Sequence, residues 1–270
     1  MNPALAPGRT ADGVAYWTLA RGSGSWLAVT HGSFGNYLDF AELLAPLADR
    51  LNLLFWDLPG HGDSRAIAPA RRLTQAADAL AAVMSAAGVP AAHQLGFSFG
   101  GMVAQCFARH HPARTLSLIA YACVPIMLAR ITSPRLANAR TQREFARTPW
   151  LAFCETFSQQ VSVRADLQEA FARKMAVQRP AVRDAIYEAM IFGMSLDPDF
   201  RYAMPVAQIR GGLDDRFPGA APAMDALAAT LPSELVEDIP GAGHLAHIEQ
   251  PEAFLAALAR LLSRLDGRRV

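Results

Sequence analysis

Short apolar runs alternate with longer amphipathic segments over most of this 270-residue chain, and this alternation constrains the fold more than any other feature. The runs have the length of buried strands, and the segments between them carry apolar residues at helical spacing. Such alternation is typical of βαβ units around a parallel sheet. It predicts an α/β fold, a mostly parallel, doubly wound sheet of about eight strands flanked by helices. We expect strands at 26–30, 51–57, 94–97, 116–122, 206–210 and 234–239, an antiparallel edge hairpin around 14–19, and helices at 73–87, 100–110, 219–230 and 252–265.

The alternation stops between about Met127 and Tyr202, where the pattern is helical throughout and carries no strand signal. This region is too long to be a simple connection between two elements. We interpret residues 127–202 as a helical insertion over the carboxyl edge of the sheet, within a core domain formed by residues 1–126 and 203–270. The alternative is a set of extra helices packed on the side of the sheet.

Composition and charge narrow the range of partners. Hydrophobic residues make up 52% of the chain and charged residues 18%, so a large core is expected and disorder is not. Lys and Arg number 25 against 24 for Asp and Glu, which argues against nucleic acid or an anionic membrane as a partner. No stretch approaches the roughly 18 apolar residues that cross a bilayer, and residues 1–12 lack the apolar core of a signal peptide. Three separated cysteines without a CxxC pair suggest buried, reduced thiols and a cytoplasmic location, while the oligomeric state stays open.

The sequence GFSFGG at residues 96–101 lies between an expected strand and an expected helix. In that context a GxSxG pattern predicts a nucleophile elbow, a sharp turn that exposes the hydroxyl of Ser98. The glycines allow a strained, tight turn, and the start of the following helix favours negative charge nearby. The alternative is an ordinary glycine-rich turn with a capping serine.

The sequence HGSFGN at residues 31–36 follows the first expected parallel strand. A loop here can direct a backbone N–H group at a carbonyl oxygen that becomes negative during acyl transfer. We expect Ser33 to supply this donor, with Phe34 as the alternative, and Phe99 to supply the second donor directly after the nucleophile. His31 is expected to fix the loop by hydrogen bonding.

Two aspartates compete for the acid of the site in GGLDDRFP, which follows the strand expected at 206–210. A carboxylate at this strand end can orient a catalytic imidazole. We favour Asp214 for its spacing from the preceding glycine and the following proline, whereas Asp215 fits a turn or a helix cap. The base should follow the acid in chain order. In GAGHLAHIE, His244 follows flexible glycines in a loop, and His247 is more typical of a structural residue on the next helix.

Five motifs in this order, HGSFGN, DLPGHGDS, GFSFGG, GGLDDRFP and GAGHLAHIEQPEAF, resemble those of the α/β-hydrolase fold family. The resemblance covers nearly the whole chain except the insertion, which is similar to the family's cap domain. It implies that Ser98 is the nucleophile, in a triad with Asp214 and His244. Dehalogenase and epoxide hydrolase relatives have an aspartate at the nucleophile position, so Ser98 argues against both reactions. The DLPGHGDS segment is implied to be structural.

The motifs together predict a serine hydrolase that cleaves a carboxylic ester or lactone of a small, largely apolar molecule by two-step acyl transfer. Hydrolysis of a C–C bond in a vinylogous diketone, aminopeptidase activity or other acyl transfer on the same triad are alternatives. A non-catalytic small-molecule binder is the alternative from another class. No metal and no cofactor are expected. Candidate pocket residues, each of which equally fits packing of the cap on the core, are Phe34, Phe97, Phe153, Met190 and Phe192.

Overall fold

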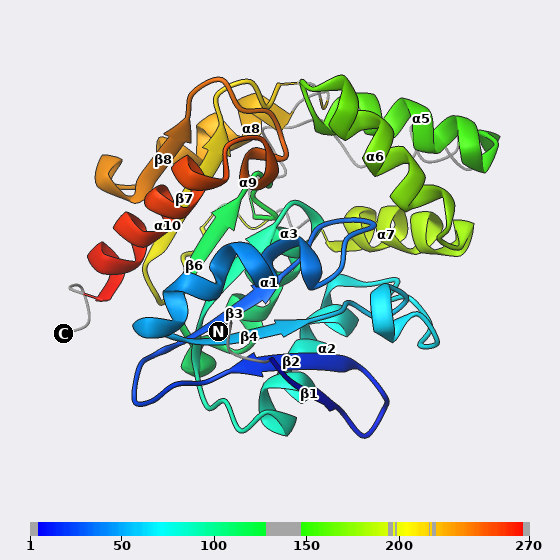
Figure 1. Ribbon diagram of the computed structural model, residues 1–270. Helices are drawn as coiled ribbons and strands as arrows, with labels where there is room; N and C mark the ends of the chain where they lie inside the picture. Colours follow the sequence, from blue (N-terminus) through cyan, green and yellow to red (C-terminus); the bar gives the residue numbers. More distant parts are fainter. Residues whose placement is uncertain are drawn as a thin grey trace.

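The computed structural model describes residues 5–127, 147–193, 197, 199–215, 217 and 220–266 (Figure 1). Its centre is one eight-stranded sheet in the order β1-β2-β4-β3-β5-β6-β7-β8. The first two strands are antiparallel to their neighbours, and all pairings from β4 to β8 are parallel. This arrangement confirms the predicted fold class and the edge hairpin. The strands are β1 Ala6–Arg9, β2 Ala15–Leu19, β3 Trp26–Thr30, β4 Asn52–Trp56, β5 Ala92–Phe97, β6 Thr115–Tyr121, β7 Val206–Gly211 and β8 Val236–Ile239.

Helices cover both faces of the sheet, and the alternation of side chains along the strands explains why. In β4, Leu53 and Phe55 belong to one buried cluster, whereas Leu54 and Trp56 belong to another. Successive residues of a strand point to opposite faces, so a fully apolar strand needs cover on both sides. The first cluster includes α1 and α10, and the second includes α2 and α3. The core helices are α1 Leu38–Leu44, α2 Leu73–Ala86, α3 Phe99–His110, α8 Ala220–Ala228, α9 Ala246–Glu249 and α10 Pro251–Asp266.

Three helices lie between β6 and β7, namely α5 Trp150–Val161, α6 Ala165–Ala176 and α7 Pro180–Gly193, and Figure 1 shows them gathered at one end of the sheet. They contact loops that follow strands. The ring of Phe34, after β3, lies 6.0 Å from that of Phe153 in α5, and the N–H of Leu245, after β8, donates to the carbonyl of Val161 at 3.2 Å. The helical segment between β6 and β7 therefore contacts the carboxyl edge of the parallel strands, where the proposed insertion was expected.

The proposed limits of this insertion, 127 and 202, stay a prediction, since residues 128–146 lie outside the described part of the chain. All three cysteines are buried and free, as expected. Within the described ranges, no helix combines the length and apolar character needed to cross a membrane.

Candidate active site

Ser98 occupies the turn between β5 and α3 with φ +52° and ψ −119°. A residue other than glycine adopts such a positive φ only at a cost of about 1–3 kcal/mol, and such strain concentrates at functional sites. The turn is held because the N–H of Ser98 donates to the carbonyl of Tyr121 at 2.9 Å. The side chain is half-buried, and its hydroxyl forms no hydrogen bond with any described residue. Ser98 therefore presents a free hydroxyl on a strained turn.

Glycine at position 100 allows α3 to begin against the end of β3. A Cβ atom on Gly100 would lie well inside van der Waals contact with the carbonyl oxygens of Thr30 and His31. The same close approach brings the loop after β3 to the turn, since a Cβ atom on Gly32 would lie 3.3 Å from the Cβ of Ser98. The two glycine-containing motifs thus come together in space.

Asp214 and His244 form a buried pair. The Nδ1 atom of His244 lies 3.0 and 2.9 Å from the two carboxylate oxygens of Asp214. Asp214 is 4% exposed, whereas its rival Asp215 is exposed. Because Nδ1 donates to the carboxylate, Nε2 is the nitrogen left with a lone pair. The arrangement suits a base whose tautomer is fixed by an acid.

The strand ends bring this pair together. The N–H of Leu213, after β7, donates to the carbonyl of Ala242, after β8, at 2.8 Å. Phe97 then places the pair beside the strained turn, because its ring lies 5.1 Å from that of His244 and it directly precedes Ser98. The structure thus brings all three predicted triad residues to one end of the sheet, with Asp214 and His244 in direct contact.

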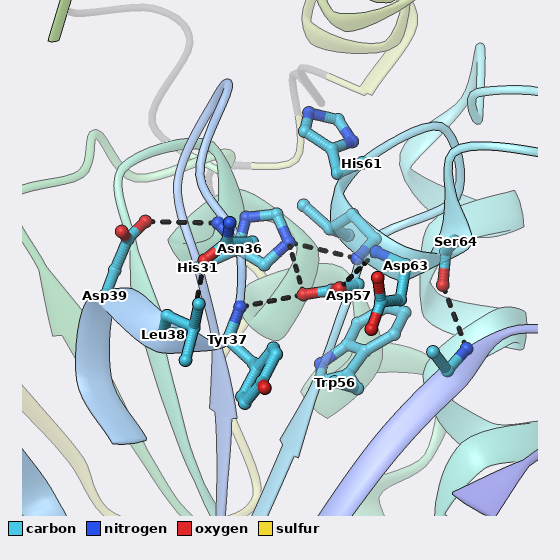
Figure 2. Close-up of polar contacts among 12 residues, drawn as sticks. His31, Asn36, Tyr37, Leu38, Asp39, Trp56, Asp57, His61, Asp63 and Ser64 are labelled. Carbon is cyan, nitrogen blue, oxygen red and sulfur yellow. Dashed lines mark hydrogen bonds and ion pairs between the residues drawn. The ribbon is translucent and has the colours of Figure 1, made fainter. Parts of the chain in front are cut away.

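His31 fixes the loop after β3, as the sequence predicted. Its Nδ1 donates to the carbonyl of Gly32 at 2.8 Å. Its Nε2 accepts the N–H of Leu58 at 3.0 Å (Figure 2). Burial lowers the pKa of His31 to about 3, so the ring is neutral near pH 7. A neutral ring is needed here because Nε2 acts as an acceptor.

The DLPGHGDS segment forms hydrogen bonds with the same loop, which agrees with its implied structural role. Figure 2 shows Asp57 between two backbone segments, and its carboxylate accepts the N–H groups of Tyr37 and Asp63, each at 2.7 Å. Burial raises the pKa of Asp57 to about 6, although both hydrogen bonds act in the opposite direction. Ser64 extends the contact to β2 by accepting the N–H of Ala15 at 2.9 Å.

The predicted oxyanion donors, Ser33 and Phe99, lie on the two loops that meet at Ser98. Neither backbone N–H donates to an acceptor among the described residues. Phe99 is the first residue of α3, where N–H groups lack partners within the helix. Both donors are therefore available to a ligand.

Phe34, the next residue in the loop, is held by the insertion. It has a φ of +61°, and its carbonyl accepts the side-chain amide of Gln178 at 2.6 Å. Its buried ring packs edge-on against Trp150, Phe153 and Phe157 of α5. Phe34 and Phe153, two predicted pocket residues, thus form the contact between insertion and core.

A cavity lies between this loop and α6, and Phe97 is the predicted pocket residue that lines it. Met190 packs against the second buried cluster, which includes residues of α2 and α3. Phe192 is 57% exposed, with the guanidinium of Arg72 lying 5.0 Å from its ring centroid. The structure therefore places Met190 and Phe192 outside the lining of this cavity.

Sequence reasoning missed the residues that α6 contributes to the cavity, Leu167, Ala170, Phe171 and Lys174. Their spacing of three, four and seven positions puts them on one face of the helix. This spacing could have identified the face from the sequence, but it could not show which part of the protein that face contacts. In the described part of the chain, no cluster of three acidic, histidine or cysteine side chains is arranged to hold a metal ion.

Comparison with known proteins agrees with the fold. A model of the alpha/beta hydrolase family matches residues 27–257, and the chain belongs to this family. It is thus an enzyme of the hydrolase class.

Two relatives span nearly the whole chain. A 2-succinyl-6-hydroxy-2,4-cyclohexadiene-1-carboxylate synthase from Enterobacter sp. is 32% identical over 246 residues, covering 88% of this chain and 91% of its own. A pimeloyl-[acyl-carrier protein] methyl ester esterase from Edwardsiella ictaluri is 30% identical over 273 residues, covering 94% and 98%. Among solved structures, a hydrolase from Pseudomonas aeruginosa superposes with a TM-score of 0.77 at 21% identity, over 96% of this chain and 98% of that one. This last similarity concerns the fold alone.

Proposed function

We propose that this hydrolase cleaves a carboxylic ester or lactone of a small, largely apolar molecule, with Ser98 as the nucleophile. The observation that carries the proposal is the Asp214–His244 pair, in which Nδ1 is bound to the carboxylate and Nε2 is left as a base. The pair lies beside Phe97, next to the strained turn that presents the serine hydroxyl. A paired imidazole near a half-buried serine whose hydroxyl has no partner among the described residues suits acyl transfer.

In the first step, Nε2 of His244 removes the proton of Ser98 as the serine oxygen attacks the carbonyl carbon. Asp214 stabilises the imidazolium that forms and stays ionised itself. The hydroxyl of Ser98 forms no hydrogen bond with a described residue, and catalytic hydrogen bonds often tighten when substrate occupies the site. His244 then donates its proton to the departing alcohol.

The negative oxygen of the tetrahedral intermediate needs donors that are already in place. The unpaired N–H groups of Ser33 and Phe99 supply two, and the start of α3 adds favourable partial charge. In the second step, water attacks the acyl-enzyme with His244 as base, and Ser98 is released. Both steps use the same donors.

The two relatives bear on the bond that is cleaved. The Edwardsiella protein is named a methyl ester esterase, which supports an ester as the substrate of this chain. The Enterobacter protein is named a synthase of a cyclohexadiene carboxylate, so comparable sequences serve more than one reaction. The nucleophile, base and donor pair favour carbonyl addition, and ester hydrolysis is the simplest reaction that uses all of them.

Aryl esters of short and medium acyl chains test the proposal directly. We expect the purified protein to hydrolyse them and a fluorophosphonate probe to label it at Ser98, with both signals lost in Ser98→Ala. Hydrolysis that persists in Ser98→Ala would contradict the role of the serine. Folded protein that neither turns over esters nor accepts the probe would favour the non-catalytic binder.

A further inference from the structure

Among the described residues that line the cavity between the loop after β3 and α6, Lys174 is the one with a permanent positive charge. We propose that Lys174 binds a carboxylate at the far end of the substrate, so that the enzyme prefers esters whose apolar chain ends in a negative charge. This inference rests on the proposed ester hydrolysis and names the class of substrate that the site selects.

The wall of the cavity that α6 forms consists of apolar side chains followed by the positive charge of Lys174. Leu167, Ala170, Phe171 and Lys174 share one face of α6 and all line the cavity. At about 1.5 Å per residue, this face extends for roughly 10 Å. Three apolar side chains followed by a cation match a ligand that has a short apolar chain and an anionic end.

Other residues that line the cavity belong to the loop after β3 and to the end of β5, next to Ser98. Gly32, Ser33 and Phe97 line the cavity there, and a Cβ atom on Gly32 would lie 3.3 Å from the Cβ of Ser98. Ser33 is also the expected oxyanion donor. The cavity therefore lies next to the turn that carries Ser98, and the apolar chain of an ester bound at Ser98 would extend into the cavity that Lys174 lines.

Lys174 has donor capacity to spare. Its ammonium group pairs with Asp39, and it donates to no other described residue, which leaves two of its three N–H groups for a ligand. The side chain is 30% exposed, so a substrate can reach it. The lysine is thus oriented by one carboxylate and able to bind another.

The charge of Asp39 is also balanced by groups other than Lys174. Its second carboxylate oxygen accepts the N–H of Asn36 at 3.1 Å, and it lies in the first turn of α1, where peptide dipoles favour a carboxylate. His247 lines the cavity as well, and burial lowers its pKa to about 3, so it is neutral near pH 7. A positively charged substrate group would be repelled by Lys174, and Asp39 is already engaged with Lys174 and Asn36. A substrate carboxylate would instead meet the free N–H groups of Lys174.

Half-esters of straight-chain dicarboxylic acids provide the test, with acyl chains of about four to eight carbons to cover the length of the α6 face. The matched neutral substrates are ethyl esters of monocarboxylic acids of the same length. We expect wild type to favour the half-ester by about tenfold in kcat/KM, mainly through KM, as a charge-assisted hydrogen bond allows. Lys174→Met should remove this preference, measured as the ratio of kcat/KM for the half-ester to kcat/KM for the neutral ester, whereas Lys174→Arg should keep it.

The neighbouring Arg173 gives a matched control, because it is exposed and pairs with Glu169 on the same helix. Arg173→Met should retain the preference for half-esters. A second measurement needs no variant: a free straight-chain dicarboxylate should inhibit neutral-ester hydrolysis competitively in wild type, and its diamide should not.

Equal turnover of half-esters and neutral esters by wild type would overturn the inference, and so would a preference that survives Lys174→Met. Should Lys174→Met fail to fold, equal inhibition by the dicarboxylate and its diamide would overturn it instead. These results leave the proposed ester hydrolysis standing. Failure of that function has a different signature, the absence of both ester turnover and labelling of Ser98 in folded wild type.

Discussion

The side-chain amide of Gln178 donates a hydrogen bond of 2.6 Å to the backbone carbonyl of Phe34. The two residues are 144 positions apart, and the bond ties the segment after α6 to the loop that carries the proposed oxyanion donor Ser33. Phe34 holds a positive φ in this loop, so its conformation depends on outside contacts. The insertion therefore helps to set the geometry of the site that it covers.

Replacing Gln178 by leucine should lower kcat on an aryl ester by about tenfold, because misplacing one oxyanion donor weakens transition-state stabilisation. The free energy of unfolding should change by only about 1 kcal/mol, the usual value of a single hydrogen bond. Gln168→Leu is the control, since Gln168 also donates to a backbone carbonyl, that of Ser162, at 2.8 Å. Equal kcat values for the two variants would contradict the proposed link to catalysis.

The pair of neighbouring aspartates gives a second prediction. Asp214→Asn should lower kcat by about 10,000-fold, because an amide neither holds the required tautomer of His244 nor stabilises its charged form. Asp215→Asn should stay within about twofold of wild type, because the side chain at position 215 is exposed. Steady-state rates on one aryl ester, with circular dichroism to show that each variant is folded, decide the matter. Comparable losses in both variants would argue against the assignment of the acid.

The sequence predicted the sheet well because its signals are local. The apolar run at Trp26–Thr30 became β3 without a change of limits, and the motifs after the strands fall at one edge as parallel topology requires. The helix α1, Leu38–Leu44, was not expected, since it is short and its N-cap residue, Tyr37, provides no side-chain cap. Tertiary packing stabilises it through Phe40 and Leu44, both fully buried.

The lining of the cavity could be predicted from the sequence only in part, for a physical reason. Aromatic content pointed to Phe192, but its position near the end of α7 exposes its ring beside Arg72. The side chains that do line the cavity, among them Leu167 and Phe171, lie on the face of α6 that packs over the loop after β3. Which face of an amphipathic helix meets the core depends on long-range contacts, and a single sequence does not record those.

Gly100 and Gly212 differ in the space available for a Cβ atom, so alanine substitutions at the two positions should differ in their effect on stability. Gly100→Ala should destabilise the protein by about 3 kcal/mol, because the added methyl group meets the backbone carbonyls of Thr30 and His31, which cannot move aside without disrupting the end of β3. At Gly212 the nearest atoms to a new Cβ are at 3.4 Å, which is ordinary contact, so Gly212→Ala should cost less than about 1 kcal/mol. Urea unfolding of both variants measures the difference, and equal costs would refute the packing argument.

Three buried histidines predict that the protein loses stability steeply in acid. Burial lowers the pKa of His31, His61 and His247 from 6.5 to about 3 in each case. Below pH 6.5 the unfolded chain therefore binds protons that the folded chain does not, and stability falls as the pH drops towards 3, by up to about 1.4 kcal/mol per pH unit for each histidine. Asp57 has the opposite effect on stability, because its pKa is raised from 3.8 to about 6 and the folded chain therefore binds a proton before the unfolded chain does. This one group offsets about one of the three histidines, so the net stability still falls in acid.

His61 is the histidine best suited to a test, because its Nε2 atom is buried without a partner among the described residues. His61→Gln removes one of the three titrating rings, and Asp57 offsets another, so the fall in the free energy of unfolding between pH 6.5 and 4, measured by urea titration, should become about half as steep. His110→Gln is the control, since His110 is exposed on the last turn of α3 and its loss should leave the slope unchanged. An unchanged slope in His61→Gln would mean that this ring is already accessible to protons in the folded protein.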